Sequence, residues 1–280
     1  MLFNSEKCPK CDSNYDVALH TCPFCGEVNK NEETKKVSKN ITMVSWKKQI
    51  LLFVCGFVGL GLISTIVSVI AAAIGNPDFN LFEKTMLTTD QLFASNTITY
   101  VLILSGIIFV VWKDWKNILH SYKRWQVYVF ALIGAAVLFG YNFLYNNVLL
   151  KSLNIGTNEN QTNALELVQK FPIGSLIVMG VCGPIVEEFT YRLGLHGILR
   201  RVNRWLPYVA SSFIFAIIHV DLSSLFSANY LNELLNFPTY LVSGLILSFI
   251  YEKEGIGSST LAHILYNSFN VLLFIFAANL

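Results

Sequence analysis

Seven runs of apolar side chains are the feature that most restricts how this 280-residue chain can fold. They cover residues 49–74, 97–112, 126–150, 172–199, 206–220, 238–251 and 257–279. A helix needs about 20 apolar residues to cross a bilayer, and helices satisfy all of their backbone hydrogen bonds internally. We therefore predict an all-α fold, a polytopic transmembrane bundle of about seven helices, in which the fifth and sixth are short.

The composition excludes other classes of protein. Hydrophobic residues make up 54% of the chain, charged residues make up 14%, and the mean hydropathy is +0.51. An ordinary soluble domain has about 25% charged residues, so a soluble globular, disordered or fibrous protein is excluded. The net charge of +2 gives no reason to expect a nucleic-acid partner, and the lipid bilayer is the expected surrounding.

Four of the six cysteines lie in the polar segment before the first apolar run. They form two C-x-x-C pairs, Cys8 with Cys11 and Cys22 with Cys25. Four thiolates at this spacing are the ligands of a tetrahedral structural zinc site. A pair of disulfides is the alternative, but residues 1–40 contain no apolar segment that would direct export. We predict a short zinc ribbon over residues 1–27 that binds one zinc ion.

The rest of the chain divides into a linker and a membrane domain. Residues 28–47 are rich in lysine and predict a solvated basic linker, and residues 48–280 predict the transmembrane domain. Because no cleavable signal is visible, we expect the first apolar run to be a retained signal anchor. Cys55 and Cys182 lie within apolar runs and are expected to be small core residues.

The distribution of lysine and arginine predicts the orientation in the membrane. If the zinc ribbon is inside, the inside segments hold fourteen of these residues and the outside loops hold three. The inside segments are 30–48, 113–124, 200–205 and 252–256, and the outside loops are 75–96, 151–171 and 221–237. Basic residues concentrate on the cytoplasmic side of membrane proteins. We predict a multi-pass cell-membrane protein with a cytoplasmic N-terminus.

The fourth apolar run contains three ionisable side chains, Glu187, Glu188 and Arg192. Each costs about 2.5–3.5 kcal/mol at the centre of a spanning helix, so the protein must compensate for this cost or use it. Glu188 and Arg192 are four residues apart on one helical face, and we expect an ion pair. Glu187 points about 100° away without a local cation. It is the carboxylate left free to act as a general base, unless all three form a structural ion cluster.

Two later runs carry polar side chains at similar depths. His219 ends the fifth run, and the seventh contains His263 and Asn267 on one helical face. At 1.5 Å per residue, Glu187 and His219 lie roughly 18 and 20 Å from the cytoplasmic side. His263 and Asn267 lie roughly 9 and 15 Å from it. Each alone is typical of packing or interhelical hydrogen bonding, but together they predict one shared polar cavity.

These residues form three ordered motifs: E-E-x-x-x-R (Glu187 to Arg192), F-x-x-x-H (Phe215 to His219) and H-x-x-x-N (His263 to Asn267). On late transmembrane helices this set resembles the CPBP family, the CAAX-protease and bacteriocin-processing intramembrane proteases also called Abi. The resemblance covers about residues 170–280. The zinc ribbon and the first two or three helices lie outside it.

The resemblance implies peptide-bond hydrolysis in or near the membrane, on a membrane-associated peptide or protein. Carried over by position, Glu187 activates water with the help of His219, and His263 and Asn267 stabilise the oxyanion. The remaining pair, Glu188 and Arg192, braces the site. A zinc metalloprotease is the second mechanism, in which Glu187, His219 and His263 would bind a catalytic zinc ion. No H-E-x-x-H motif is present. The sequence does not decide between the two mechanisms, and we favour the metal-free glutamate mechanism.

Two other functions compete with a protease. A non-catalytic binding or immunity protein would use the same cavity to hold a partner, although it has no evident need for an unpaired Glu187. An ion or proton transporter is disfavoured because the apolar runs show no duplicated halves. A prenylated carboxy-terminal motif is the substrate theme of eukaryotic members of the family, and peptide maturation, immunity or regulated proteolysis that of bacterial ones. A compact chain with a zinc ribbon is more typical of a bacterial member.

Overall fold

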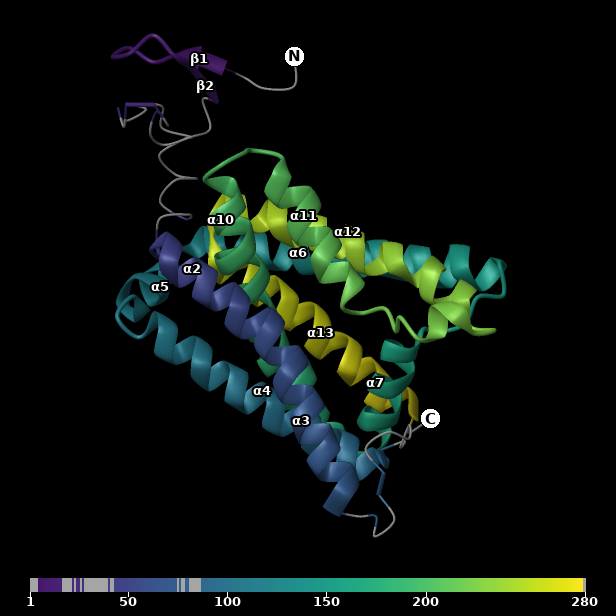
Figure 1. The fold of residues 1–280 in the computed structure, drawn as a ribbon. Helices are drawn as coiled ribbons and strands as arrows, with labels where there is room; N and C mark the ends of the chain where they lie inside the picture. The colour runs from purple at the N-terminus through teal and green to yellow at the C-terminus, as the bar shows by residue number, and fades with distance from the viewer. Residues whose placement is uncertain are drawn as a thin grey trace.

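The computed structural model describes residues 5–16, 22, 24, 25, 27, 40, 43–74, 76, 79, 80 and 87–278. Near the N-terminus, strands β1 (Ser5–Lys7) and β2 (Asn14–Asp16) pair in antiparallel register. The regular structure of the described residues from Trp46 onward is helical, and Figure 1 shows this bundle with the hairpin at one end. Most of the predicted basic linker lies outside the described residues.

Six helices in the described part of the chain are long and apolar enough to cross a membrane. They are Trp46–Ile74, Thr89–Val111 (α4), Trp125–Leu150, Pro172–Arg200, Tyr230–Glu254 (α12) and Ile256–Phe276, the last within α13 (Ile256–Ala278). The first consists of α2 (Trp46–Phe53), η1 (Val54–Val58) and α3 (Gly59–Ile74), and the third of α6 (Trp125–Leu144) and η2 (Tyr145–Leu150). The prediction of a multi-pass helical membrane protein is confirmed.

The prediction that the fifth and sixth helices are short is confirmed for the fifth and wrong for the sixth. The fifth, α11 (Leu206–Ile217), has 12 residues and is shorter than a spanning helix. The sixth, α12, begins eight residues before the predicted apolar run and continues through Pro238. The added turns contain Glu233 and Asn236, which are each 1% exposed. Hydropathy missed these turns because their polar side chains face other parts of the protein and not lipid.

Two shorter helices connect the spanning helices. Helix α5 (Trp115–Ser121) follows α4, and α7 (Glu159–Lys170) precedes the fourth spanning helix. Helix α7 is amphipathic and has Asn158 as its N-cap, whose side chain accepts a hydrogen bond from the backbone N–H of Gln161. The polar character of α7 kept it out of a prediction that was based on apolar runs.

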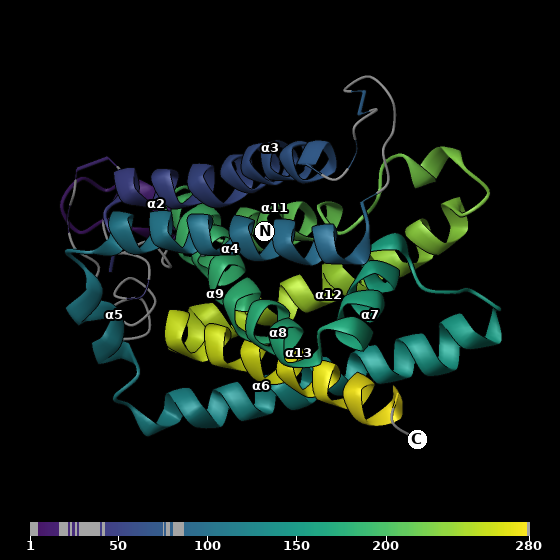
Figure 2. The ribbon, with the colours of Figure 1, turned by 90° about the horizontal axis from the view of Figure 1, so that it is seen from below.

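The fourth spanning helix is the central element of the bundle. It contains α8 (Pro172–Ile177), η3 (Val178–Cys182), α9 (Gly183–Glu187), η4 (Glu188–His196) and α10 (Gly197–Arg200). Of the six long helices it has the largest buried share, 56% of its most apolar window. Figure 2 shows it between the layer of α2, α3 and α4 and the layer of α6 and α13. This placement explains how a helix with several charged residues is tolerated.

Close backbone contact holds the first helix against η4. A Cβ atom on Gly56 would collide with the side chain of Thr190, so only glycine fits there. Two of the central segments, η3 and η4, have π-helical turns, which often occur at functional sites. These wide turns flank the short α9 and therefore frame Glu187 and Glu188.

Candidate active site

Glu187 and Glu188 lie at the junction of α9 and η4. Pro184 occupies the first turn of α9, where its missing N–H costs little. The Glu188 side chain is fully buried, and that of Glu187 is 10% exposed. The two neighbouring carboxylates therefore have different surroundings.

Glu188 is paired with Arg192, as the four-residue spacing predicts. An Arg192 guanidinium nitrogen lies 3.3 Å from Glu188 Oε1, and both side chains are fully buried. The guanidinium carbon also lies 4.8 Å from the centre of the Phe215 ring, a cation–π distance. The charge of Arg192 is therefore met by one carboxylate and one aromatic face.

His263 lies between the two glutamates. Its Nδ1 is 3.1 Å from Glu188 Oε1, and its Nε2 is 3.6 Å from Glu187 Oε2. The sequence did not predict the contact with Glu188, because it joins residues 75 positions apart on different helices. The contact with Glu188 is a hydrogen bond in which the carboxylate accepts, so Nδ1 carries a proton. The contact with Glu187 is longer than a hydrogen bond.

His219 follows the last turn of α11. Its Nδ1 lies 2.7 Å from the backbone oxygen of Phe215. A carbonyl only accepts, so Nδ1 carries the proton, and Nε2 of the neutral ring has a free lone pair. The Phe215 ring centre lies 4.9 Å from that of His219 and 6.0 Å from that of His263. Phe215 is thus the shared neighbour of both imidazoles and of Arg192.

One cavity of about 750 Å³ joins four of the predicted residues. Glu187, His219, His263 and Asn267 all line it, whereas Glu188 and Arg192 do not. The side-chain amide of Asn267 donates to the backbone oxygen of Met179 at 3.3 Å. The structure therefore brings together the six residues in two sets, four at the cavity wall and two behind it.

Other parts of the cavity wall were not predicted. Amide and hydroxyl side chains line it at Asn142, Asn146, Asn147, Thr157, Asn160, Gln161, Thr239, Tyr240, Ser243, Tyr266 and Asn270. Large apolar side chains line it at Leu138, Phe139, Phe143, Leu273 and Phe274. Many of these residues come from the parts of α6, α7, α12 and α13 that lie away from the N-terminal hairpin (Figure 1). A sequence signal existed only for Asn270, which continues the helical face of His263 and Asn267.

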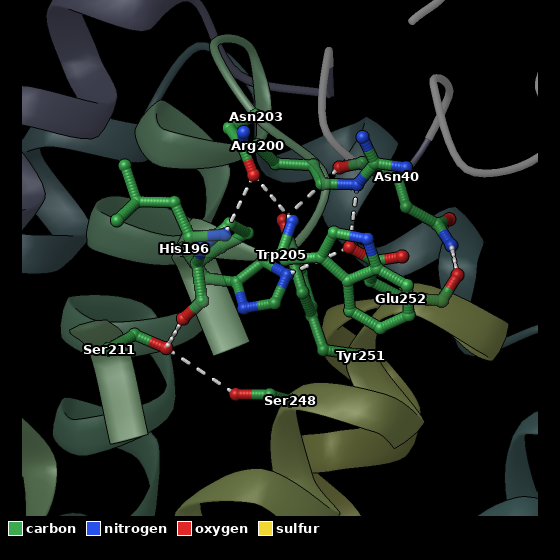
Figure 3. A network of polar contacts seen from close by, with 11 residues as sticks. Asn40, His196, Arg200, Asn203, Trp205, Ser211, Ser248, Tyr251 and Glu252 are labelled. Carbon is green, nitrogen blue, oxygen red and sulfur yellow. Dashed lines mark hydrogen bonds and ion pairs between the residues drawn. The ribbon is translucent and has the colours of Figure 1, made fainter. Parts of the chain in front are cut away.

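A second buried polar network lies at the other end of the central helix, and the sequence analysis missed it (Figure 3). Glu252 Oε1 accepts a hydrogen bond from Arg200 Nε at 2.6 Å and lies 3.1 Å from His196 Nε2. Asn40 donates to the backbone oxygen of Glu252 at 3.4 Å. A signal was present, since His196 and Arg200 continue the four-residue spacing of Glu188 and Arg192. These residues do not line the cavity.

The four head cysteines form a separate cluster. Their sulfur atoms all lie within 4.8 Å of one another, with Cys8 and Cys25 at 3.5 Å and Cys11 and Cys22 at 3.6 Å. All four are free thiols, so the disulfide alternative does not describe this structure. Hydrogen bonds from Ser13 lower the pKa of the Cys11 thiol to about 6. Although a backbone hydrogen bond at Glu27 acts in the opposite direction, burial and the neighbouring thiols raise the pKa of the Cys25 thiol to about 12, so the geometry and not the acidity of these thiols indicates a metal site. The cluster can therefore hold a metal ion.

The geometry also bears on the predicted alternative of a catalytic zinc ion at Glu187, His219 and His263. Among the described residues, the four head cysteines are found as a cluster of candidate metal ligands, because their sulfur atoms all lie within 4.8 Å of one another. Glu187, His219 and His263 do not form such a group. As arranged here, these three side chains do not fit a shared zinc ion.

The structure is that of a multi-pass membrane protein in which a carboxylate, two imidazoles and an amide line one cavity inside the helical bundle. Residues 169–269 match the family described as type II CAAX prenyl endopeptidase Rce1-like. The chain is also 30% identical over 118 residues to the "Putative membrane peptidase YdiL" of Bacillus subtilis (strain 168). By these matches the carboxy-terminal region is similar to CAAX-type membrane proteases, the kind of protein that its three motifs resemble.

The extent of these similarities is limited. The alignment with the Bacillus protein covers 41% of this chain and 43% of that protein, so the chain spans less than half of this relative. No solved structure gives a significant match to the chain. The ribbon and the first helices are therefore described from this structure alone.

Proposed function

We propose that this protein is an intramembrane endopeptidase that hydrolyses a peptide bond of a membrane-associated peptide or protein. The observation that supports this proposal best is that two adjacent carboxylates have different surroundings. Glu188 is fully buried against Arg192, whereas Glu187 lines the cavity beside His263. A carboxylate that can take a proton from water must reach the substrate space, and of the two only Glu187 does.

In this mechanism Glu187 and His219 hold the attacking water. The free Nε2 lone pair of His219 accepts one hydrogen bond from water, and the Glu187 carboxylate takes a proton as the oxygen attacks the carbonyl carbon. As the tetrahedral intermediate collapses, Glu187 gives its proton to the amine nitrogen and the C–N bond breaks, so the carboxylate is regenerated.

His263 and Asn267 act on the negative charge that develops on the carbonyl oxygen. We infer that His263 is cationic, with Nδ1–H donating to Glu188 and Nε2–H available at the cavity. The Asn267 amide contributes a second donor from one turn further along α13. Donors fixed before the reaction stabilise an oxyanion strongly in a site of low dielectric. The Glu188–Arg192 pair keeps this arrangement in place.

We also propose an orientation and a domain division. The head of residues 1–27 is a zinc ribbon on the cytoplasmic side, joined by the linker of residues 28–47 to the membrane domain of residues 48–280, whose protease core covers about 170–280. The excess of basic residues on the ribbon side supports this orientation. The amide-lined part of the cavity then lies toward the opposite side of the membrane, from which the peptide would enter.

The test is a comparison of the peptides in membranes that contain wild-type protein or Glu187→Gln. The substitution keeps the size and hydrogen bonding of the side chain but removes the base. The matched control is Glu166→Gln, an exposed carboxylate on α7. We expect specific peptides to disappear with Glu187→Gln and to remain with Glu166→Gln. If the peptides persist in Glu187→Gln, the protein is a non-catalytic binder or immunity protein that uses the same cavity.

A further inference from the structure

We propose that Asn158, Glu233 and Tyr240 form a clamp that positions His219 for its part in the proposed reaction. The inference rests on the proposed function, because His219 is the residue through which the clamp acts. None of the three belongs to the sequence motifs, and all three contact either the His219 ring or the backbone around it. They come from the start of α7 and from α12, so the clamp joins two elements to the end of α11.

The clamp acts on a tightened helix end. His219 N–H donates to the Ala216 oxygen at 3.1 Å, and Val220 N–H donates to the Ile217 oxygen at 3.2 Å. In a regular α-helical turn His219 N–H would donate to the Phe215 oxygen instead. The tightened turn leaves this carbonyl open, as is common at helix ends, and the His219 ring occupies it. The backbone of this turn therefore decides which nitrogen of His219 carries the proton.

Two buried side chains hold this turn in place. Asn158 Nδ2 donates to the His219 backbone oxygen at 2.9 Å. Glu233 Oε2 accepts from Asp221 N–H at 3.0 Å, and Oε1 accepts from Glu159 N–H at 2.8 Å. Asn158 and Glu233 are each 1% exposed. The Glu233 carboxylate thus ties the segment after His219 to the residue that follows Asn158, and these hydrogen bonds offset part of the cost of its burial.

Tyr240 holds the ring itself. Its ring is stacked on that of His219 with centres 4.4 Å apart and planes 17° apart. Its hydroxyl donates to Asn158 Oδ1 at 3.2 Å. Tyr240 and Glu233 are seven residues apart on α12, two turns along one face. One face of α12 therefore fixes both the backbone and the ring of His219.

Release of the clamp has a defined consequence. The turn can relax to regular α-helical hydrogen bonding, in which His219 N–H takes the Phe215 oxygen. The ring then loses its partner at Nδ1, exchanges between tautomers and no longer presents a fixed Nε2 to water. A displacement of about 1 Å in a catalytic site can lower a rate on the order of a hundredfold.

Three conservative substitutions separate the parts of the clamp. Asn158→Asp keeps the oxygen that caps α7 but removes the donor to His219, and Glu233→Gln removes one of two acceptors. Their control is Glu166→Gln, an exposed carboxylate on α7. Tyr240→Phe keeps the stacked ring and loses the hydroxyl. Its control is Tyr145→Phe, in which the lost hydroxyl donates a 2.9 Å hydrogen bond to the backbone oxygen of Leu235 on α12.

The first measurement is the ¹⁵N spectrum of the five histidines in the full-length protein, with His219 assigned by its loss in His219→Gln. We expect one tautomer, protonated at Nδ1, in the wild type and in both controls. Asn158→Asp and Glu233→Gln are expected to show a mixture, and Tyr240→Phe a smaller change. A single unchanged tautomer in both Asn158→Asp and Glu233→Gln overturns the clamp. A variant that fails to fold is recognised by altered signals of the other histidines, and the remaining variant then decides.

The second measurement is the yield of the peptides that depend on Glu187. We expect a loss of about 10- to 100-fold in Asn158→Asp, with the controls close to wild type. If these peptides do not depend on Glu187, the protease proposal fails while the tautomer spectra still test the clamp. If they depend on Glu187 but the tautomer is unchanged in the clamp variants, the clamp alone fails.

Discussion

The central helix contributes to two buried triads of the same composition. Glu188, Arg192 and His263 form one beside the cavity, and Glu252, Arg200 and His196 form the other at the opposite end of the helix. Each contains one carboxylate, one guanidinium and one imidazole. The composition of a buried triad therefore does not by itself identify an active site.

The difference lies in what surrounds each triad. The first has a fourth charged member, Glu187, which lines a cavity of about 750 Å³ together with His263. The second triad lines no part of that cavity. Instead, the backbone oxygen of Glu252 accepts a hydrogen bond from the side chain of Asn40, which precedes Trp46 at the start of the first spanning helix. Buried ion pairs often add little stability yet are costly to break. We therefore interpret the first triad as a group that positions the residues of a reaction site, and the second as a group that stabilises the fold.

The largest expected effect is on catalysis in Glu187→Gln. Removal of a general base typically lowers a rate by about 10²–10⁴-fold, so we expect the Glu187-dependent products to fall by at least about a hundredfold. The thermal unfolding temperature in detergent should fall less than in Glu252→Ala, because Arg192 and His263 keep Glu188 as their carboxylate partner. A variant that keeps its activity but unfolds early would make Glu187 a structural residue like Glu252.

The reverse result is expected for Glu252→Ala. Its removal leaves Arg200 and His196 buried without their carboxylate, and breaking a buried pair in this way costs about 3–5 kcal/mol. We expect a clear fall in the unfolding temperature, with product yield per folded molecule unchanged. Glu166→Gln serves as the control for loss of a carboxylate at an exposed position. Loss of activity with normal stability would show that the second triad also takes part in the reaction.

A somewhat smaller loss is expected in Asn267→Ala. Loss of one oxyanion donor usually lowers kcat by about 10²–10³-fold, or about 2.7–4 kcal/mol. The hydrogen bond of Asn267 to the Met179 oxygen is long, at 3.3 Å, so little stability should be lost. Asn147→Ala is a suitable comparison, because Asn147 lines the same cavity but lies on η2, away from the motif residues. Equal losses in both variants would indicate substrate binding and not oxyanion stabilisation.

Sequence spacing predicted the first triad only in part. The four-residue interval gave the Glu188–Arg192 pair, and matching depths in the membrane brought His219, His263 and Asn267 to one cavity. The spacing could not predict that His263 contacts Glu188, because that contact depends on how the two helices are rotated relative to each other. Helical spacing predicts which face of its own helix a side chain occupies. It does not predict which side chain of another helix that face contacts.

The second triad and the His219 clamp were missed for a related reason. Glu252 was assigned to a loop, and Glu233 lies before the predicted sixth helix, because both are charged residues at the ends of an apolar run. Both are nevertheless buried in α12. Hydropathy measures how well a side chain suits a lipid environment. A prediction based on it therefore ends a helix at the first polar side chains, even where these are buried against other parts of the protein. Asn158 follows no periodic pattern, and its role depends on the tertiary fold.

The smallest expected effect on the cavity comes from loss of metal in the head. We expect one zinc per chain in the wild type and none in the double variant Cys8→Ser, Cys22→Ser, measured by elemental analysis. Two thiolates remain in that variant, which is too few for a closed tetrahedral site. Because Glu187, His219 and His263 do not gather around a shared point, the Glu187-dependent products should persist.

The control for this experiment is Cys55→Ser, which changes a half-buried cysteine in η1 outside the head and should retain the zinc. A zinc ion that remains in the double variant and is lost in His219→Ala would place a metal in the cavity. The first triad would then support a metalloprotease. His263 would bind the ion through Nε2, while its Nδ1–H, 3.1 Å from Glu188 Oε1, would keep that buried carboxylate paired.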